Sequence, residues 1–204
     1  KQNDKNDSIL HIFNYNYIVD GKKFFNEPID IHSNLFYHEL TFLTTPLNIL
    51  KDINEIFSKI DIEINKFILS SYARTVKNFS KKDLKNELCL ICFDNEKTSL
   101  VVFKNSALIH YKTFSIGLKH LIKDISKVCL ISENESKNIA INFCNDLFDK
   151  NNFLKGEKKN ESLSSSFFTE TKFRKISEDL IKKILYYRLE EIFKKIILEL
   201  NYVN

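Results

Sequence analysis

The stretch that decides the fold runs from Cys92 to His120 and reads CFDNEKTSLVVFKNSALIHYKTFSIGLKH. Two apolar runs follow a polar turn, and Asn105-Ser106 between them suits a two-residue hairpin because Asn tolerates positive φ. A third apolar run, ELCLICF, precedes the polar turn. The pattern predicts a three-stranded antiparallel meander over 87–114, at one edge of a larger sheet. Its first strand is expected to be buried on both faces, because it is almost entirely apolar.

The residues before this meander predict a small α+β unit with the order strand, strand, helix, strand. Alternation of apolar and polar residues predicts strands at Ile9–Val19 and Phe36–Thr44, and the first of them ends in the turn Asp20-Gly21. Thr45-Pro46 predicts a helix start with a cap and a proline at the first helical position. A third strand is predicted over Lys66–Tyr72. The apolar stripe expected along the helix consists of Leu47, Leu50, Ile53, Phe57 and Ile60.

Three helices are predicted after the meander. Helical periodicity indicates Leu118–Val128 and Glu133–Phe148, and the strongest pattern covers Ile176–Leu200, where Ser177 can cap the N-terminus. The polar residues 149–175 between them predict a mobile surface excursion. The wide apolar stripe of the last helix consists of Ile181, Leu185, Leu189, Ile192, Phe193, Ile196 and Leu200.

Arg188 lies at the margin of that apolar stripe. It is one helical turn from Ile184 and one from Ile192, and Glu191 is three residues further on and can pair with it. A cation beside an apolar surface can serve both the carboxylates and the hydrophobic anchors of a peptide. The alternative is an intrahelical ion pair on the surface with no binding role.

The amino-acid composition argues against a nucleic-acid-binding protein and against a membrane-spanning one. Among the 204 residues the formal net charge is +4, and basic and acidic residues alternate, so no basic face for nucleic acid is expected. No run of about eighteen apolar residues predicts a membrane span. Met is absent, so we expect a piece of a longer chain, and the abundance of Lys, Asn, Ile and Phe fits an AT-rich genome.

The cysteine pair Cys89 and Cys92 has the CxxC spacing of redox and metal sites. Residues three apart on a strand point to opposite faces, so two such thiols cannot share a ligand. No second pair stands at zinc spacing, and no nucleophile motif appears. We therefore expect buried structural cysteines, no metal site and no catalytic residue.

Three stretches in the right order resemble the FtsA family of actin-like bacterial cell-division proteins. They are NYNYIVDGKKFFNEPIDI (14–31), LVVFKNSALIHYKTFSIGLKHLIKDIS (100–126) and ISEDLIKKILYYRLEEIFKKI (176–196). The resemblance implies an α/β, partial actin-like ATPase fold. Residues 1–66 would form the FtsA-specific subdomain, also known as an SHS2-like subdomain, 67–128 the inner subdomain of the second actin lobe, and 129–204 the start of its outer subdomain.

The resemblance also implies a nucleotide site, with ATP as the cofactor. The family's second phosphate loop, D-I-G-G-G-T-T-D, aligns with residues 92–99, and its following glycine pair aligns with Gly117 and Leu118. Glycines let backbone N–H groups approach phosphate oxygens, and side chains obstruct that approach. The aligned turn is Asp94, Asn95, Glu96, Lys97 and Thr98, of which only Lys97 and Thr98 are expected to be able to touch a phosphate.

The site is therefore expected to be degenerate. Cys92 stands where the family has the aspartate that orients metal-bound water, so ATP hydrolysis is not expected, whereas weak ATP binding stays open. Glu135, Lys137 and Ala140 align with the positions that flank adenine.

The resemblance implies an adaptor that tethers filaments of the tubulin-like FtsZ to the inner membrane and recruits later division proteins. Tyr187, Arg188 and Glu191 match the "R..E" helix on which the FtsZ C-terminal tail docks. It also implies self-association into filaments, for which the strand at Phe36–Thr44 is a candidate surface, and membrane contact through a C-terminal helix absent from this chain. The expected location is the cytoplasmic side of the inner membrane at the division site. Two alternatives stay open: a pilus-assembly platform protein like PilM, and an actin-fold ATPase.

Overall fold

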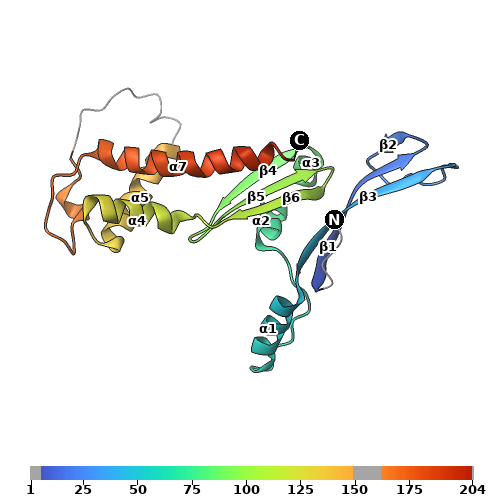
Figure 1. Cartoon of the computed structure of the whole chain (residues 1–204), viewed down its shortest axis with the longest axis horizontal. Helices are drawn as coiled ribbons and strands as arrows, with labels where there is room; N and C mark the ends of the chain where they lie inside the picture. Colours follow the sequence, from blue (N-terminus) through green and yellow to red (C-terminus); the bar gives the residue numbers. More distant parts are fainter. Residues whose placement is uncertain (1–5, 149–161, 204) are drawn as a thin grey trace. The chain divides into compact units, whose positions relative to one another are not determined.

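The computed structural model describes residues 6–148 and 162–203, which form a mixed α/β structure (Figure 1). The strands are β1 (Asp7–Val19), β2 (Lys22–Phe24), β3 (Phe36–Pro46), β4 (Leu88–Phe93), β5 (Thr98–Lys104) and β6 (Ala107–Phe114). The helices are α1 (Leu47–Ser58), α2 (Ser70–Asn78), α3 (Lys81–Lys85), α4 (Leu118–Cys129), α5 (Glu133–Phe148) and α7 (Glu178–Leu200), with a 3-10 turn η1 (Ser165–Phe167).

The described residues form two compact units. One contains the residues up to 92 together with 100–112, and the other contains 93–99 together with the residues from 113 onward. The subdomain boundaries at 66 and 128 rest on the resemblance alone and stay a prediction.

The first unit contains the sheet β2-β1-β3, in which β1 pairs antiparallel with both neighbours. The predicted turn at Asp20-Gly21 is confirmed, and both residues have positive φ, 47° and 80°. The Asp20 carboxylate accepts hydrogen bonds from the N–H groups of Asn34 and Leu35, at 3.1 and 2.9 Å from Oδ1. This closes the loop that leads into β3.

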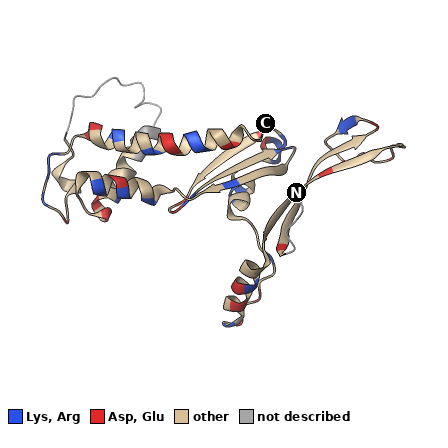
Figure 2. Ribbon diagram, viewed as in Figure 1, with Lys and Arg blue, Asp and Glu red and all other residues tan. Residues whose placement is uncertain are grey.

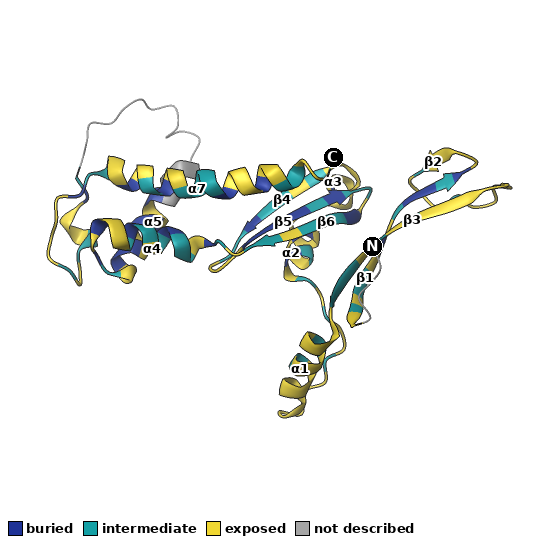
Figure 3. Ribbon diagram, viewed as in Figure 1, coloured by how far each residue is buried: buried dark blue, intermediate teal, exposed yellow. Residues whose placement is uncertain are grey.

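The predicted cap at Thr45 is wrong. Thr45 pairs with Ser8, and β3 continues through Pro46, because the long β1 supplies a partner for each of these residues. Helix α1 therefore starts at Leu47, whose N–H donates to the carbonyl of Asn6 at 2.8 Å. None of the α1 residues is buried, so its predicted apolar stripe covers no core within the described residues (Figure 3).

The strand predicted over Lys66–Tyr72 is also wrong. Residues 66–69 form no strand, and Ser70 begins α2. Leu69 and Tyr72 pack against the core of the first unit, while Ser71 and Thr75 are the buried residues of α2. A short apolar run does not distinguish a strand from a helix start, and here packing decides for the helix.

The meander over 87–114 is confirmed, with strand order β4-β5-β6 and no helix between 98 and 114. Asn105 and Ser106 both have positive φ, 53° and 63°, as a two-residue hairpin requires. Burial of the first strand on both faces is wrong, because β4 is an edge strand. Cys92 is buried but Cys89 is exposed, and the buried strand is the central β5. Nor do the described residues extend this sheet beyond three strands.

The core of the first unit lies between this meander and the segments that precede it. Tyr72 stacks on Phe103 with ring centroids 6.0 Å apart. The Asn105 side chain donates to Asn16 Oδ1 at 2.9 Å, which ties the β5–β6 hairpin to β1. The buried residues of this core are Phe13, Leu84, Val101, Phe103, Ala107 and Leu108.

The second unit contains α4, α5 and α7, which pack together. All three helices are confirmed, and Ser177 Oγ caps α7 by accepting from the N–H of Leu180 at 3.3 Å. The fully buried side chains of this unit include Leu121, Ile125, Ile139, Ile181, Leu185, Ile192 and Ile196.

The segment before α7 is anchored by a buried carboxylate. Glu135 on α5 is fully buried and accepts hydrogen bonds from the N–H groups of Glu170 and Thr171, at 2.8 and 2.9 Å, and from the Thr171 hydroxyl at 2.9 Å. Leu163 is buried, and its N–H donates to the carbonyl of Ile176 at 2.8 Å.

The predicted mobile excursion over 149–175 is therefore wrong for 162–175, and its first part, 149–161, lies outside the described residues. Glu135 also completes a capping box with Ser132: its carboxylate accepts from the Ser132 N–H at 3.0 Å, and Ser132 Oγ accepts from the Glu135 N–H. The S-x-x-E spacing could have revealed this helix start, but not the long-range contacts.

The buried Glu135 carboxylate predicts that the fold is less stable in acid. Burial alone would raise the pKa of Glu135, but hydrogen bonds from Thr171, Glu170 and Ser132 outweigh it and lower the pKa to about 2. A carboxylate whose pKa falls on folding stabilises the fold above its unfolded pKa and loses that contribution as pH drops through the folded value. We expect the free energy of unfolding to fall between pH 4.5 and about 2.

The measurement is a series of thermal melts across that range. Glu135→Gln should lower the melting temperature at pH 7 by about 5 °C or more, because the amide presents one acceptor oxygen instead of two. In the Glu135→Gln variant the melting temperature should also change less between pH 4.5 and about 2. The matched control is Glu133→Gln, because Glu133 is an exposed carboxylate two residues away in the same first turn of α5. An equally flattened profile in that variant would contradict the assignment.

Candidate functional site

The turn that the sequence aligns with a phosphate loop is closed against the start of α4. Within the turn, the Asp94 N–H donates to the carbonyl of Lys97 at 2.8 Å. A Cβ added at Gly117 would lie 2.5 Å from the carbonyl oxygens of Asp94 and Asn95 and from the Lys97 nitrogen. Such separations are far below van der Waals contact, so glycine is required at 117 for this approach of two backbones.

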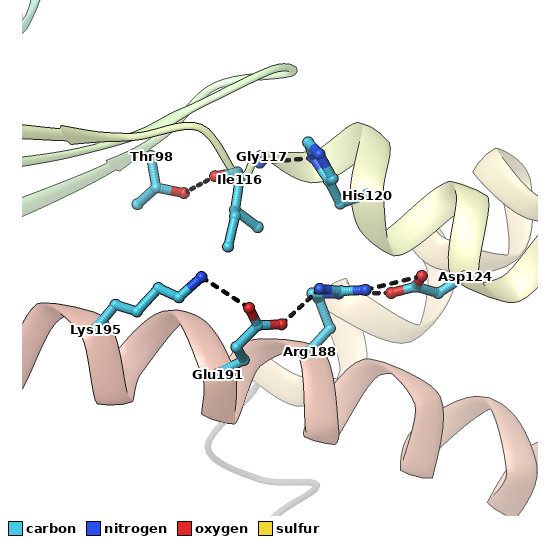
Figure 4. Close-up of polar contacts among 8 residues, drawn as sticks. All are labelled: Thr98, Ile116, Gly117, His120, Asp124, Arg188, Glu191 and Lys195. Carbon is cyan, nitrogen blue, oxygen red and sulfur yellow. Dashed lines mark hydrogen bonds and ion pairs between the residues drawn. The ribbon is translucent and has the colours of Figure 1, made fainter.

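The backbone donors at the start of α4 are already used. The N–H groups of Leu118 and Lys119 donate to the carbonyls of Asp94 and Asn95, at 3.0 and 2.9 Å. The Gly117 N–H donates to His120 Nδ1 at 3.1 Å (Figure 4). A phosphate-binding helix start would instead direct such groups at its ligand.

A carboxylate also lies at this helix start. Glu96 pairs with Lys119 at 2.8 Å, and this hydrogen bond is the main reason that the pKa of Glu96 is lowered. The carboxylate is therefore charged at neutral pH, where it complements the positive end of the helix dipole. An incoming phosphate would meet both this negative charge and the carbonyl oxygens of the turn.

The two residues expected to retain phosphate contact differ in their placement. Lys97 is exposed, so its predicted contact with a phosphate stays a prediction. Thr98 is fully buried, and its hydroxyl donates to the carbonyl of Ile116 at 2.6 Å (Figure 4). In this conformation Thr98 holds the turn to the segment before α4 and cannot reach a ligand.

Arg188 on α7 forms a clamp with α4. Its Nε and one terminal nitrogen bind the two carboxylate oxygens of Asp124, at 2.6 and 3.0 Å. The other terminal nitrogen binds Glu191 at 2.5 Å, which confirms the predicted pair (Figure 4). Lys195 also binds Glu191, at 2.8 Å, and this hydrogen bond comes first among the causes that lower the pKa of Glu191.

Asp124 was missed at the sequence level. A single aspartate between the buried Leu121 and Ile125 gives no signal about its partner, 64 residues further along the chain. The consequence is that the cation expected to face a ligand already contacts two carboxylates of its own unit.

Tyr187 is the member of the predicted partner site that faces solvent most fully. Its side chain is 66% exposed, and its ring lies edge-on to that of Tyr186, with centroids 5.9 Å apart. The surrounding charges of α7 alternate in sign along the helix (Figure 2). The structure thus places an exposed aromatic residue next to a fixed guanidinium.

The two predicted sites belong to the same unit and meet along α4. Gly117 precedes the first turn of α4, His120 follows in that turn, and Asp124 lies one turn further (Figure 4). The ring of Phe93, just before the phosphate-loop turn, contacts that of Phe193 on α7, with centroids 6.3 Å apart. Glu135, aligned with an adenine-flanking position, is instead fully buried in its own hydrogen-bond network.

Comparison with curated protein sequences finds a distant relative of this chain. A stretch of 133 residues, 65% of this chain, is 21% identical to the cell division protein FtsA of Borreliella burgdorferi. The match spans 32% of that protein's length. No family model matches the chain.

The likeness indicates a distant FtsA-like or actin-like relationship, consistent with the mixed α/β structure. No helix within 6–148 and 162–203 combines the length and the apolar character needed to cross a bilayer. Within the same ranges no group of His, Cys, Asp and Glu side chains is arranged to hold a metal ion.

Proposed function

We propose that this chain is part of a cell-division adaptor related to FtsA. The observation that carries the proposal is the similarity to the cell division protein FtsA of Borreliella burgdorferi. In this proposal the intact protein binds the C-terminal tail of FtsZ, connects FtsZ filaments to the inner membrane, recruits later division proteins and self-associates. It acts on the cytoplasmic side of the membrane at the division site.

The test is made in cells that produce the intact protein. A fluorescent fusion should form a band at the division site together with FtsZ, and depletion should give long cells that do not divide. A diffuse signal combined with normal division after depletion would contradict the adaptor role.

The tail-binding surface in this proposal is the part of α7 around Tyr187, Arg188 and Glu191. An amphipathic tail needs an apolar anchor point and a cation, and Tyr187 supplies exposed aromatic area at low entropic cost. Arg188 is held by Asp124 and Glu191, so its remaining N–H groups have a fixed direction.

We expect Tyr187→Ala to weaken binding of a labelled FtsZ tail peptide about tenfold or more, measured by fluorescence anisotropy on the intact protein. Tyr202→Ala is the matched control, because Tyr202 is 85% exposed and lies after the end of α7 at Leu200. Its affinity should change less than about twofold. Equal losses in the two variants would remove Tyr187 from the surface.

We further propose that the adaptor does not hydrolyse ATP and binds it weakly or not at all. The turn offers carbonyl oxygens to α4, and Asp94 and Glu96 add negative charge beside a polyanion. Losing two charge-assisted backbone contacts weakens binding by about 10²- to 10⁴-fold.

The measurement is isothermal titration calorimetry of the intact protein with Mg-ATP, with Mg²⁺ alone as the control. We expect no heat of binding at micromolar nucleotide. A micromolar dissociation constant for Mg-ATP would show that the closed turn opens for the nucleotide, and the proposal of a degenerate site would be wrong.

A further inference from the structure

We propose that the second unit carries a docking groove for an acidic peptide segment with an apolar anchor residue. The groove lies between the end of α4 and the start of α7 and has a volume of about 820 Å³. It goes beyond the proposed function, because it is separate from the part of α7 around Tyr187. The residues that line it are Val128, Cys129, Ser162, Arg174, Lys175, Ile176, Ser177, Asp179, Leu180 and Lys183.

The charges of this groove favour an acidic occupant. Three of its lining residues, Arg174, Lys175 and Lys183, are cations, and Asp179 is the single acid among them. Asp179 already pairs with Lys183 at 3.2 Å. Arg174 and Lys175 are exposed and form no salt bridge within 6–148 and 162–203, so their charge is available to a ligand.

The groove also offers apolar surface for one anchor side chain. Val128 is 55% exposed and Leu180 is 38% exposed, and the buried Ile176 and Cys129 also line the groove. Burial of an aliphatic or aromatic side chain against such surface is worth roughly 25 cal/mol per Å² of apolar area. A concave surface that combines apolar and cationic lining residues suits a peptide better than a flat lipid surface.

The cationic segment is fixed before any ligand arrives. The Glu135 carboxylate holds Glu170 and Thr171, and Thr171 is three residues before Arg174. Immediately after Lys175, the carbonyl of Ile176 accepts from Leu163. Because both ends of the segment are anchored, binding requires little ordering of this backbone.

The contrast with Arg188 strengthens this assignment. The guanidinium of Arg188 is engaged by Asp124 and Glu191 within the unit. Arg174 and Lys175 have no carboxylate partner among the described residues, so an added carboxylate gains more beside them.

The probe is a short labelled peptide in which aspartate and glutamate flank a central leucine, titrated against the chain by fluorescence anisotropy. Replacing Arg174 and Lys175 together by glutamate should weaken binding by about tenfold or more. Lys22→Glu with Lys23→Glu is the matched control, because these exposed neighbours on β2 give the same change in net charge. The control should keep its affinity, and circular dichroism should show that both variants are folded.

Three further measurements complete the test: the Leu180→Ser variant, a peptide with amides in place of its carboxylates, and phosphatidylglycerol vesicles as an alternative ligand. Leu180→Ser should weaken binding about threefold or more without a change in charge, and a peptide with amides in place of its carboxylates should not bind. Equal losses in the groove variant and the Lys22/Lys23 control would show non-specific attraction and overturn the proposal. It would also be overturned if the peptide did not bind, or if only phosphatidylglycerol vesicles bound through Arg174 and Lys175.

Discussion

Gly117→Ala is expected to lower the free energy of unfolding of the second unit by about 3 kcal/mol or more. The added Cβ would lie 2.5 Å from three backbone atoms of the turn, contributed by Asp94, Asn95 and Lys97. Backbone cannot move aside as a flexible side chain can, so the turn must leave α4, and the hydrogen bonds from Leu118 and Lys119 are lost with it. Overpacking of this kind typically costs about 1–3 kcal/mol before such losses are added.

The measurement is urea unfolding followed by circular dichroism, with hydrogen exchange over 118–129 as the local readout. Gly21→Ala is the matched control: nothing lies within 4 Å of its added Cβ, and its φ of +80° is the only source of strain. That variant should lose about 1 kcal/mol. Equal losses in the two variants, or unchanged exchange over 118–129 in Gly117→Ala, would show that the contact between turn and helix is not tight.

Arg188→Glu is expected to have the second large effect, on both stability and tail binding. The new carboxylate would face Asp124 and Glu191, so a bidentate ion pair is replaced by a group of three acids. The side chains of Arg188 and Asp124 are 26% and 27% exposed, which makes the pair partly desolvated. Breaking such a pair and adding repulsion should cost about 3 kcal/mol of unfolding free energy.

Under the proposed function, the same variant should weaken binding of the FtsZ tail about thirtyfold or more. Lys194→Glu is the control charge reversal on α7, because Lys194 is exposed and pairs only with Glu190 at 2.9 Å among the described residues. Unchanged tail affinity in a folded Arg188→Glu protein would remove Arg188 from the site.

Two further variants test whether Arg188 contacts the tail directly or only holds α7 against α4. Asp124→Asn weakens the clamp but leaves the cation in place. If Arg188 contacts the tail directly, this variant should keep or raise the tail affinity, because the guanidinium then has fewer carboxylate partners. If Arg188 acts only by holding α7, Asp124→Asn should lose stability and affinity together. The charge swap, Asp124→Arg with Arg188→Asp, should recover stability relative to either single reversal.

Local sequence signals located most of the elements. The hairpin at Asn105-Ser106, the cap at Ser177 and the three helices of the second unit were all predicted from residue type and periodicity. The wrong predictions concern segments whose secondary structure depends on tertiary packing. Lys66–Tyr72 carried a short apolar run that fits a strand or a helix start equally well, and α2 forms because Leu69 and Tyr72 pack against the core.

The candidate site shows the same division. The lack of glycines in the turn and the pairing of Arg188 with Glu191 could be read directly, because both involve residues close in the chain. The partnerships of Arg188 with Asp124 and of Glu135 with Thr171 could not, because they join residues 64 and 36 positions apart.

The sequence by itself determined the meander, its hairpin and the amphipathic helices, since these depend on backbone preferences and on periodicity within a few residues. Only the tertiary structure decided that the 94–97 turn closes on α4 through its carbonyl groups, that Thr98 is buried, and that Arg188 is already bound by carboxylates. The physical reason is that a side chain's type states what it can bind, whereas its actual partner depends on which distant groups the packed helices bring within hydrogen-bond distance.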